Sequence, residues 1–335
     1  MRVRSWILSA VALLAATGWG CKGTHHPGRD AADAQAAEAA PRHPSSQAIQ
    51  AKSFAGGCPR FAPARNLGRV HEKDLTEASG LAVSRRNPQV LWSHNDAGGK
   101  PKLFALDRSG RELGSYTLKR AELVDWEDVC LGPGAESGEW TLYVGDVGAN
   151  EQKRDQIVVY KLQEPNVELD QKPKKRKIKA VVAYRYRYPD GLSRDVETLM
   201  VDPQTGHLYL ATKTSGTQAE LYLARIPADE QAVSPLQRVA SLRLLSDGTT
   251  APAFITGGDI AADGSAILVR TSTDAYLWPR RSGESIAAAV GREPCRIRLE
   301  NEPQGEAIAF SPKGDGFYTL SEGKHPEIHY YAREP

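Results

Sequence analysis

The stretch "DVETLMVDPQTGHLYLATKT", residues 195–214, has the pattern of two β-strands joined by a tight turn. Small or polar residues alternate with apolar ones on both sides of "DPQTG", which is rich in residues that turns prefer. The first strand nevertheless opens with a carboxylate, Glu197, among apolar neighbours. A buried carboxylate without a partner is costly, so the sequence raises the question of what Glu197 does there.

The same unit recurs four more times along the chain. The segments "SGLAVSRRNP", "EDVCLGPGAE", "TGGDIAADGS" and "EAIAFSPKGD" each combine a first strand with a Gly, Pro or Asp turn. Second and third strands follow in every unit, for example "VLWSHND" and "KLFALDR" in the first, and a fourth strand is visible in four units. Short antiparallel strands in fours, repeated about every forty to seventy residues, are typical of a β-propeller.

The two ends of this repeat predict how the ring closes. The fifth unit ends after three strands at Pro335, and "ARNLGRVHE", residues 64–72, precedes the first unit without another assignment. An outer strand from this segment would complete the last blade and remove its open edge. We therefore predict an all-β fold, a five-bladed β-propeller closed by an N-terminal strand. The alternative is six blades, with one hidden between Lys161 and Asp195, where the basic run at 172–177 is interpreted as a solvated loop.

The N-terminus has the features of an export signal. Arg2 and Arg4 precede the apolar run "WILSAVALLAA", and small residues in "TGWGC" lead to Cys21. This arrangement resembles a bacterial lipobox, in which the cysteine is lipidated and becomes the mature N-terminus; ordinary secretion is the alternative. The predicted organisation is a signal peptide over 1–20, a disordered tether over 21–57 and a propeller over 58–335. A lipid anchor would place the protein in the cell envelope, on the periplasmic or outer-membrane face.

The cysteines and the net charge indicate the compartment and the kinds of partner to expect. An exported compartment permits a disulfide, and since Cys130 lies within a predicted strand, the expected pair is Cys58 with Cys295. The chain has 43 Lys and Arg against 41 Asp and Glu, a net charge of +2. A net charge this small creates no long-range electrostatic field that would favour nucleic acid as a partner. A monomer is expected, with the membrane reached only through the N-terminal lipid.

The aligned first strands predict a metal site on the propeller axis. Their equivalent positions carry three carboxylates and two hydroxyls: Ser79, Glu127, Glu197, Thr256 and Glu306. Side-chain alternation places all five on the same face of strands that line the central channel. Three like charges would repel there, and Ca²⁺, which takes six to eight oxygen ligands, would relieve the repulsion. The alternative is a wet channel in which these groups bind water. The absence of His and Cys from the set argues against zinc or copper.

The ends of the second strands should gather at one mouth of the channel. They include Asp96, Asp146, Lys213 and Arg270. In the predicted catalytic arrangement, Asp96 or Asp146 accepts a proton from water, and Lys213 and Arg270 stabilise negative charge on a small anionic ligand such as phosphate. Ion pairing at the rim is the structural alternative for the same residues.

Several segments resemble known propellers. "SGLAVS", "LWSHNDAGG", "DWEDV" and "LYVGDVGANEQKRDQIVVYKL" are similar to exported bacterial propellers of unassigned function, over most of residues 76–335. The five-bladed layout, the acidic axis and "LYVGDVGAN" resemble the calcium-dependent apyrases, in which a central calcium holds the phosphates of a nucleoside diphosphate and activates water. Where the apyrase motif continues Gly-Lys-Glu-Trp, this chain has Gly148, Ala149, Asn150 and Glu151.

The resemblance implies a calcium-dependent hydrolase. Propeller phytases and lactonases also use calcium at the channel, which extends the implied reaction to phosphoesters or lactones. The competing hypothesis is a non-catalytic propeller with structural calcium, which binds a glycan, a peptide or an envelope protein.

Overall fold

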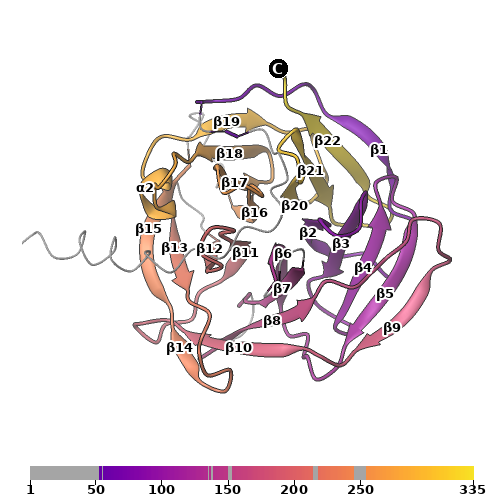
Figure 1. Ribbon diagram of the computed structural model, residues 1–335, viewed down its shortest axis with the longest axis horizontal. Coiled ribbons are helices and arrows are strands. Elements are labelled where there is room, and N and C mark those ends of the chain that lie inside the picture. Colours follow the sequence, from indigo (N-terminus) through magenta and orange to yellow (C-terminus); the bar gives the residue numbers. More distant parts are fainter. Residues whose placement is uncertain are drawn as a thin grey trace, which may run out of the picture. The chain divides into compact units, whose positions relative to one another are not determined.

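The computed structural model describes residues 53–54, 56–134, 136, 139–149, 153–213, 218–244 and 254–335. These residues belong to the second of two units into which the contacts divide the chain, Glu38–Pro335. Within this unit the described strands form five sheets set around a common axis, so the fold is an all-β, five-bladed propeller, as predicted (Figure 1). The predicted signal peptide, the predicted lipidation site Cys21 and most of the predicted tether lie outside the described residues.

Each blade begins with its innermost strand and runs outward. Blade 1 contains β2 (Ala78–Val83), β3 (Val90–Asn95), β4 (Lys102–Asp107), β5 (Glu112–Leu118) and β9 (Lys174–Ile178). Blade 2 contains β6 (Trp126–Pro133), β7 (Trp140–Asp146), β8 (Ile157–Gln163), β10 (Val182–Arg187) and β14 (Val233–Pro235). Blade 3 contains β11 (Val196–Val201), β12 (Leu208–Thr212), β13 (Gln218–Ala224) and β15 (Gln237–Arg243). Blade 4 contains β16 (Ile255–Ile260), β17 (Ala266–Thr271), β18 (Asp274–Pro279) and β19 (Cys295–Arg298), with the short helix α2 (Ile286–Val290) before β19.

The fifth blade closes the ring as the sequence predicts. It contains β20 (Gly305–Phe310), β21 (Gly316–Ser321), β22 (Glu327–Ala332) and, outermost, β1 (Arg65–Arg69) from the other end of the domain. β1 pairs antiparallel with β22, so that Arg65 lies opposite Tyr330. Figure 1 shows β1 running along the outside of β22. The N-terminal strand thus covers the edge that the C-terminal blade would otherwise leave unpaired.

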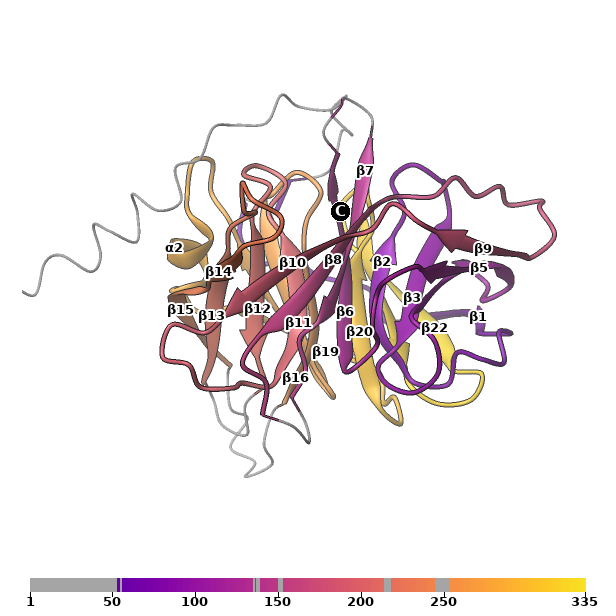
Figure 2. The ribbon, with the colours of Figure 1, turned by 90° about the horizontal axis from the view of Figure 1, so that it is seen from below.

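The six-blade alternative is wrong, and the interpretation of residues 172–177 as a loop holds only for residues 172–173, because residues 174–177 belong to strand β9, which lies beside β5 (Figure 2). The stretch considered for a sixth blade supplies outer strands to two existing blades. β9, whose sequence is KKRKI, pairs in parallel with β5, and β10 pairs antiparallel with β8. Four of the five β9 residues are exposed, so its basic side chains are solvated while its backbone bonds a neighbour. Charged outer strands of this kind also discourage edge-to-edge association.

The core lies between neighbouring blades and around the axis. The innermost strands contact one another around the ring: β2 contacts β6 and β20, and β11 contacts β6 and β16. All six residues of β2 and all six of β11 are buried. Burial of these apolar strands on both faces stabilises the ring through the hydrophobic effect. No helix of the described residues has the length and apolar character needed to cross a bilayer.

Described residues before the predicted boundary at residue 58 also pack against the propeller. Phe54, which the sequence analysis assigned to the tether, is fully buried against Phe310 with ring centroids 5.1 Å apart. Its backbone N–H donates to Ser265 Oγ at 2.9 Å. A disulfide joins Cys58 to Cys295 in β19, and Cys130 is a buried free thiol. These contacts attach the N-terminal segment to blades 4 and 5.

Candidate functional site

The five predicted axial residues share one structural feature, which is a β-bulge. Each occupies the second position of the first strand of its blade: Ser79, Glu127, Glu197, Thr256 and Glu306. In each blade the pairing register with the second strand shifts across that residue. A bulged residue has no partner opposite it and its side chain is re-aimed. Five equivalent bulges therefore turn these five side chains out of the ladder at the same level of the propeller.

Three carboxylates come together between blades 2 and 3. Asp125, Glu127 and Asp195 each offer an oxygen, and these oxygens all lie within 4.8 Å of one another. Asp125 and Asp195 precede the first strands of blades 2 and 3 and are partly exposed, whereas Glu127 is buried. The set consists of hard oxygen donors with no His or Cys, which is the donor chemistry of Ca²⁺. It shares only Glu127 with the five residues predicted from the sequence.

Glu127 is the central member of this triad. Its side chain is 3% exposed, and Oε1 is buried with no hydrogen-bond partner among the described residues. Burial raises the pKa of Glu127 well above its usual range, and the charges of Glu197, Asp125 and Asp195 raise it further. A buried, unpartnered carboxylate oxygen that faces two other carboxylates is costly unless a proton or a cation compensates it.

The loop after β7 covers this cluster with backbone. The N–H groups of Val147 and Gly148 donate to the Asp125 carbonyl at 3.1 and 3.2 Å, and Ala149 N–H donates to Asp195 Oδ1 at 2.9 Å. A Cβ on Gly148 would lie 2.0 Å from Glu127 Oε1 and 2.6 Å from Asp125 Oδ2. Glycine is therefore required here by close approach.

Asp146 holds that loop and is not free to act as a base, contrary to the prediction. Its side chain is buried and ion-paired to Arg154 at 2.6 Å. Arg154 also donates to the Gly148 carbonyl at 3.1 Å, and Asp146 Oδ1 accepts from Asp125 N–H at 3.2 Å. Residues 147–149 thus form the roof of the acidic cluster, which explains the glycine at 148 and the aspartate at 146 that holds the loop.

Glu197 lies beside the triad and is paired with Lys213. Lys213 Nζ lies 2.5 Å from Glu197 Oε1 and 3.7 Å from Asp195 Oδ2. Burial raises the pKa of Glu197 to about 7 even though Lys213 opposes the shift. The ammonium group of Lys213 is therefore ion-paired with carboxylates of the protein, whereas the sequence pattern predicted that it binds an anionic ligand.

The acidic surroundings continue to blades 5 and 1. Burial raises the pKa of Glu306 to about 8, with further contributions from the charges of Glu197 and Glu322. The pKa of Glu322 is raised to about 6 by burial and by the charges of Asp96 and Glu77. Asp96 is partly exposed, and burial raises its pKa to about 6, with added repulsion from Glu77 and Asp125. Carboxylates from four blades thus face one another at this end of the channel, with Lys213 among them.

The two axial hydroxyls join neighbouring blades. Ser79 Oγ donates to the Glu127 carbonyl at 2.6 Å and lies 3.5 Å from Glu127 Oε2. Thr256 Oγ1 donates to the Gly305 carbonyl at 2.9 Å, which links blade 4 to blade 5. Ser79 therefore lies against Glu127 of the triad, whereas Thr256 contacts the backbone of blade 5.

Arg270 does not lie free at the mouth, which corrects its predicted role. Its side chain is fully buried, 2.8 Å from Glu302. It also donates from Nη1 to the Ala307 carbonyl at 3.0 Å, and Glu302 accepts a hydrogen bond from Thr319 Oγ1 at 2.5 Å. This buried pair connects blades 4 and 5, and the guanidinium group of Arg270 is therefore not accessible to a ligand.

The sequence reasoning missed Asp125 and Asp195. A signal was available, because both stand two residues before an axial glutamate, in "DWE" and "DVE". Glu77 occupies the same position before Ser79. In blades 1, 2 and 3 this spacing marks an acidic residue that lies just before the bulge.

Comparison with known proteins finds only distant structural similarity. No protein-family model matches the chain, and no curated protein sequence matches it. Solved structures with a similar fold include the RRP9 WD40 repeats, with a TM-score of 0.41 and 10% identity over 83% of this chain and 99% of that one. They also include XC5397 from Xanthomonas campestris, a gluconolactonase, with a TM-score of 0.42 and 11% identity over 88% of this chain and 99% of that one.

Proposed function

We propose that this protein is a calcium-dependent hydrolase with its metal centre at the channel mouth. The observation that carries the proposal is the unpartnered, buried Oε1 of Glu127 within the triad of Asp125, Glu127 and Asp195. Ca²⁺ fits this donor set, because it binds carboxylates and carbonyls in flexible geometry. When bound, the ion would polarise a substrate oxygen and acidify a water molecule.

The protein's own residues supply the remaining functions. Asp96 is the candidate general base, because a carboxylate with a pKa of about 6 can take up a proton near neutral pH. Lys213 holds Glu197 and Asp195 in place at the edge of the triad. The roof formed by Gly148 and Ala149 excludes water from one side of Glu127.

The charges at the mouth favour an uncharged substrate. Lys213 is engaged by two carboxylates and Arg270 is buried with Glu302, so neither offers its charge to a phosphate. A dianionic phosphoester would meet a surface of carboxylates and gain attraction from the metal alone. A lactone brings no charge and exposes a carbonyl oxygen to the ion. We therefore place lactones before phosphoesters as the substrate class.

Calcium titration and a hydrolysis panel test the proposal. Glu127→Gln should lower calcium affinity by about tenfold or more, because the charge of the ligand set tunes such sites. Glu293→Gln, on the exposed surface, is the matched control and should leave calcium affinity unchanged. Calcium-dependent hydrolysis of a lactone should fall with Glu127→Gln and with Asp96→Asn. Equal calcium affinity in the parent and Glu127→Gln would contradict the metal site.

The second candidate is a binding module with structural calcium. The burial of Glu127 favours it, because a deeply enclosed ligand suits an ion that holds blades together. In that case calcium would raise the melting temperature while lactones and phosphoesters remain uncleaved. For either function we propose that the chain is exported and held at the cell envelope through a lipid on Cys21. Radiolabelled palmitate incorporated by the parent and lost in Cys21→Ser would support the anchor.

A further inference from the structure

A second site is formed where the ring closes, between blade 5 and blade 1. A cavity of about 500 Å³ opens there, away from the residues of the channel site. β1, β21 and β22 of blade 5 and the hairpin turns of blade 1 contribute its walls. This volume lies within the range of small-molecule sites and is far larger than a bare oxyanion requires.

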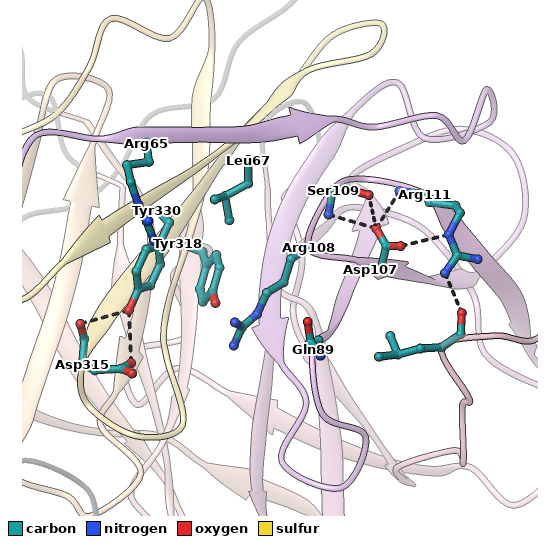
Figure 3. A pocket seen from close by; sticks show the side chains of 11 residues that line it. Arg65, Leu67, Gln89, Asp107, Arg108, Ser109, Arg111, Asp315, Tyr318 and Tyr330 are labelled. Carbon is teal, nitrogen blue, oxygen red and sulfur yellow. Dashed lines mark hydrogen bonds and ion pairs between the residues drawn. The ribbon is translucent and has the colours of Figure 1, made fainter.

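Two guanidinium groups in the cavity have no acidic partner among the described residues. Arg65 lies over the ring of Tyr330 and Arg108 over the ring of Tyr318, each with Cζ 5.5 Å from the ring centroid. Arg108 Nε is buried without a hydrogen-bond partner in the part of the chain that the structure describes. Figure 3 shows Arg108 extended across the cavity toward Tyr318. Stacked arginines with unused donors suit a carboxylate or a phosphate.

The acidic residues of the cavity are already engaged by other groups. Asp107 accepts hydrogen bonds from the Ser109 hydroxyl at 2.7 Å and from Arg111 Nε at 2.9 Å. Asp315 Oδ1 accepts from the Tyr330 hydroxyl at 3.1 Å. Neither carboxylate forms an ion pair with Arg65 or Arg108. Their remaining lone pairs can accept from hydroxyl groups of a ligand.

The two arginines are held on closely packed backbones. A Cβ on Gly68 would lie 2.3 Å from the Ser109 carbonyl oxygen, and one on Gly110 would lie 2.1 Å from the Arg69 carbonyl oxygen. The N–H of His71 donates to the Gly110 carbonyl at 2.8 Å. β1 and the turn that carries Arg108 therefore meet without intervening side chains, which fixes the separation of the two backbone segments that carry the arginines before a ligand arrives.

Gln89 provides an independent indication of function. The hairpins between the first and second strands of blades 3, 4 and 5 each place a glycine in the left-handed region: Gly206, Gly264 and Gly314, with φ of 71°, 73° and 63°. In blade 1 the same hairpin has Gln89 at φ 67°, and its side chain lines the cavity. A side chain in this conformation is strained relative to glycine, and at this position the amide of Gln89 lines the cavity, where it can hydrogen-bond a ligand.

We propose that this cavity binds a small acidic sugar, meaning a sugar-sized molecule that carries a carboxylate or a phosphate group. Arg65 and Arg108 bind the anionic group, Gln89 hydrogen-bonds beside it, and Asp107 and Asp315 accept from hydroxyls. The site uses none of the channel residues and does not depend on the proposed hydrolase activity.

Titration calorimetry on the full chain in EDTA tests the proposal, with four probes: glucuronate, glucose 6-phosphate, inorganic phosphate and glucose. Glucuronate, glucose 6-phosphate or both should bind, and which of them binds identifies the anionic group. Inorganic phosphate should bind more weakly than the sugar anion, because it leaves most of the cavity unfilled. Both sugar anions are tested up to about 10 mM, where a site with a dissociation constant of about 1 mM would be mostly occupied. If neither anion gives binding heat at that concentration, the proposal is overturned. Glucose binding as tightly as the anions would also overturn it.

Variants locate the binding. Arg65→Gln and Arg108→Gln should each weaken binding by about tenfold or more and reduce its dependence on salt. Arg243→Gln, on the exposed outer strand of blade 3, is the matched control and should bind as the parent does. Gln89→Gly should melt at a higher temperature than the parent and yet bind more weakly, which separates binding from folding. Unchanged affinity in both arginine variants would show that the ligand binds elsewhere.

Discussion

Replacing Glu306 with glutamine should change how stability depends on pH. Burial, together with the charges of Glu197 and Glu322, raises the pKa of Glu306 to about 8 from an ordinary value of 4.5. Between these two pH values the unfolded chain has released a proton that the folded protein still holds. The free energy of unfolding contributed by this group is therefore complete below about pH 4.5 and falls as the pH rises to about 8.

The magnitude follows from the same numbers. Each pKa unit corresponds to about 1.4 kcal/mol, so ionising Glu306 lowers the free energy of unfolding by at most about 5 kcal/mol. Glu306→Gln removes this loss and also relieves the repulsion on Glu197. We expect the variant to be more stable than the parent by about 1.5 to 5 kcal/mol at pH 8, and equal to it near pH 4.5.

Urea unfolding of the parent and of Glu306→Gln in EDTA, at intervals from about pH 4.5 to 9, measures this difference. Glu197 and Glu322, with pKa values raised to about 7 and about 6, add to the slope in both proteins, so the difference between the curves reports Glu306 together with its repulsion on these two neighbours. Glu293→Gln on the exposed surface should follow the parent at every pH. Parallel curves for Glu306→Gln and the parent, or a less stable variant at pH 8, would refute the argument from buried repulsion.

Three further outcomes are expected. Gly148→Ala should lower calcium affinity by about tenfold or more, because its methyl group would displace Glu127; calorimetric affinity equal to the parent would show that the triad is not the site. Arg270→Met should lower the free energy of unfolding by about 3 to 5 kcal/mol, because the buried Glu302 would keep only His329 as a cationic partner, whereas Arg270→Met combined with Glu302→Gln should recover part of that loss in denaturant titrations. Deletion of residues 58–72 should give insoluble or unfolded protein, because β22 would lose its partner strand; a soluble monomer with the parent's circular dichroism would argue against closure by β1.

The blade count followed from local pattern, but two segments depended on long-range pairing. Turn residues and alternating strands repeat along the chain, so the five units and the displaced strand at residues 64–72 could be read directly from the sequence. The basic strand β9 could not, because its residues have the composition of a loop and become a strand only by pairing with β5. Phe54 is similar, since only the neighbouring Phe310 makes its burial possible.

The sequence by itself determined that carboxylates converge at the channel, and only the tertiary structure decided which of them meet. Alignment of repeats identified Glu127, Glu197 and Glu306 because equivalent positions in a propeller share one level of the axis. It could not reveal the bulge at each of these positions, since a bulge depends on the register with the second strand. Nor could it show that Arg270 pairs with Glu302, because charge partners are chosen by distance in space. Strand pattern is a local property of the chain, whereas the grouping of Asp125, Glu127 and Asp195 arises from the packing of two blades.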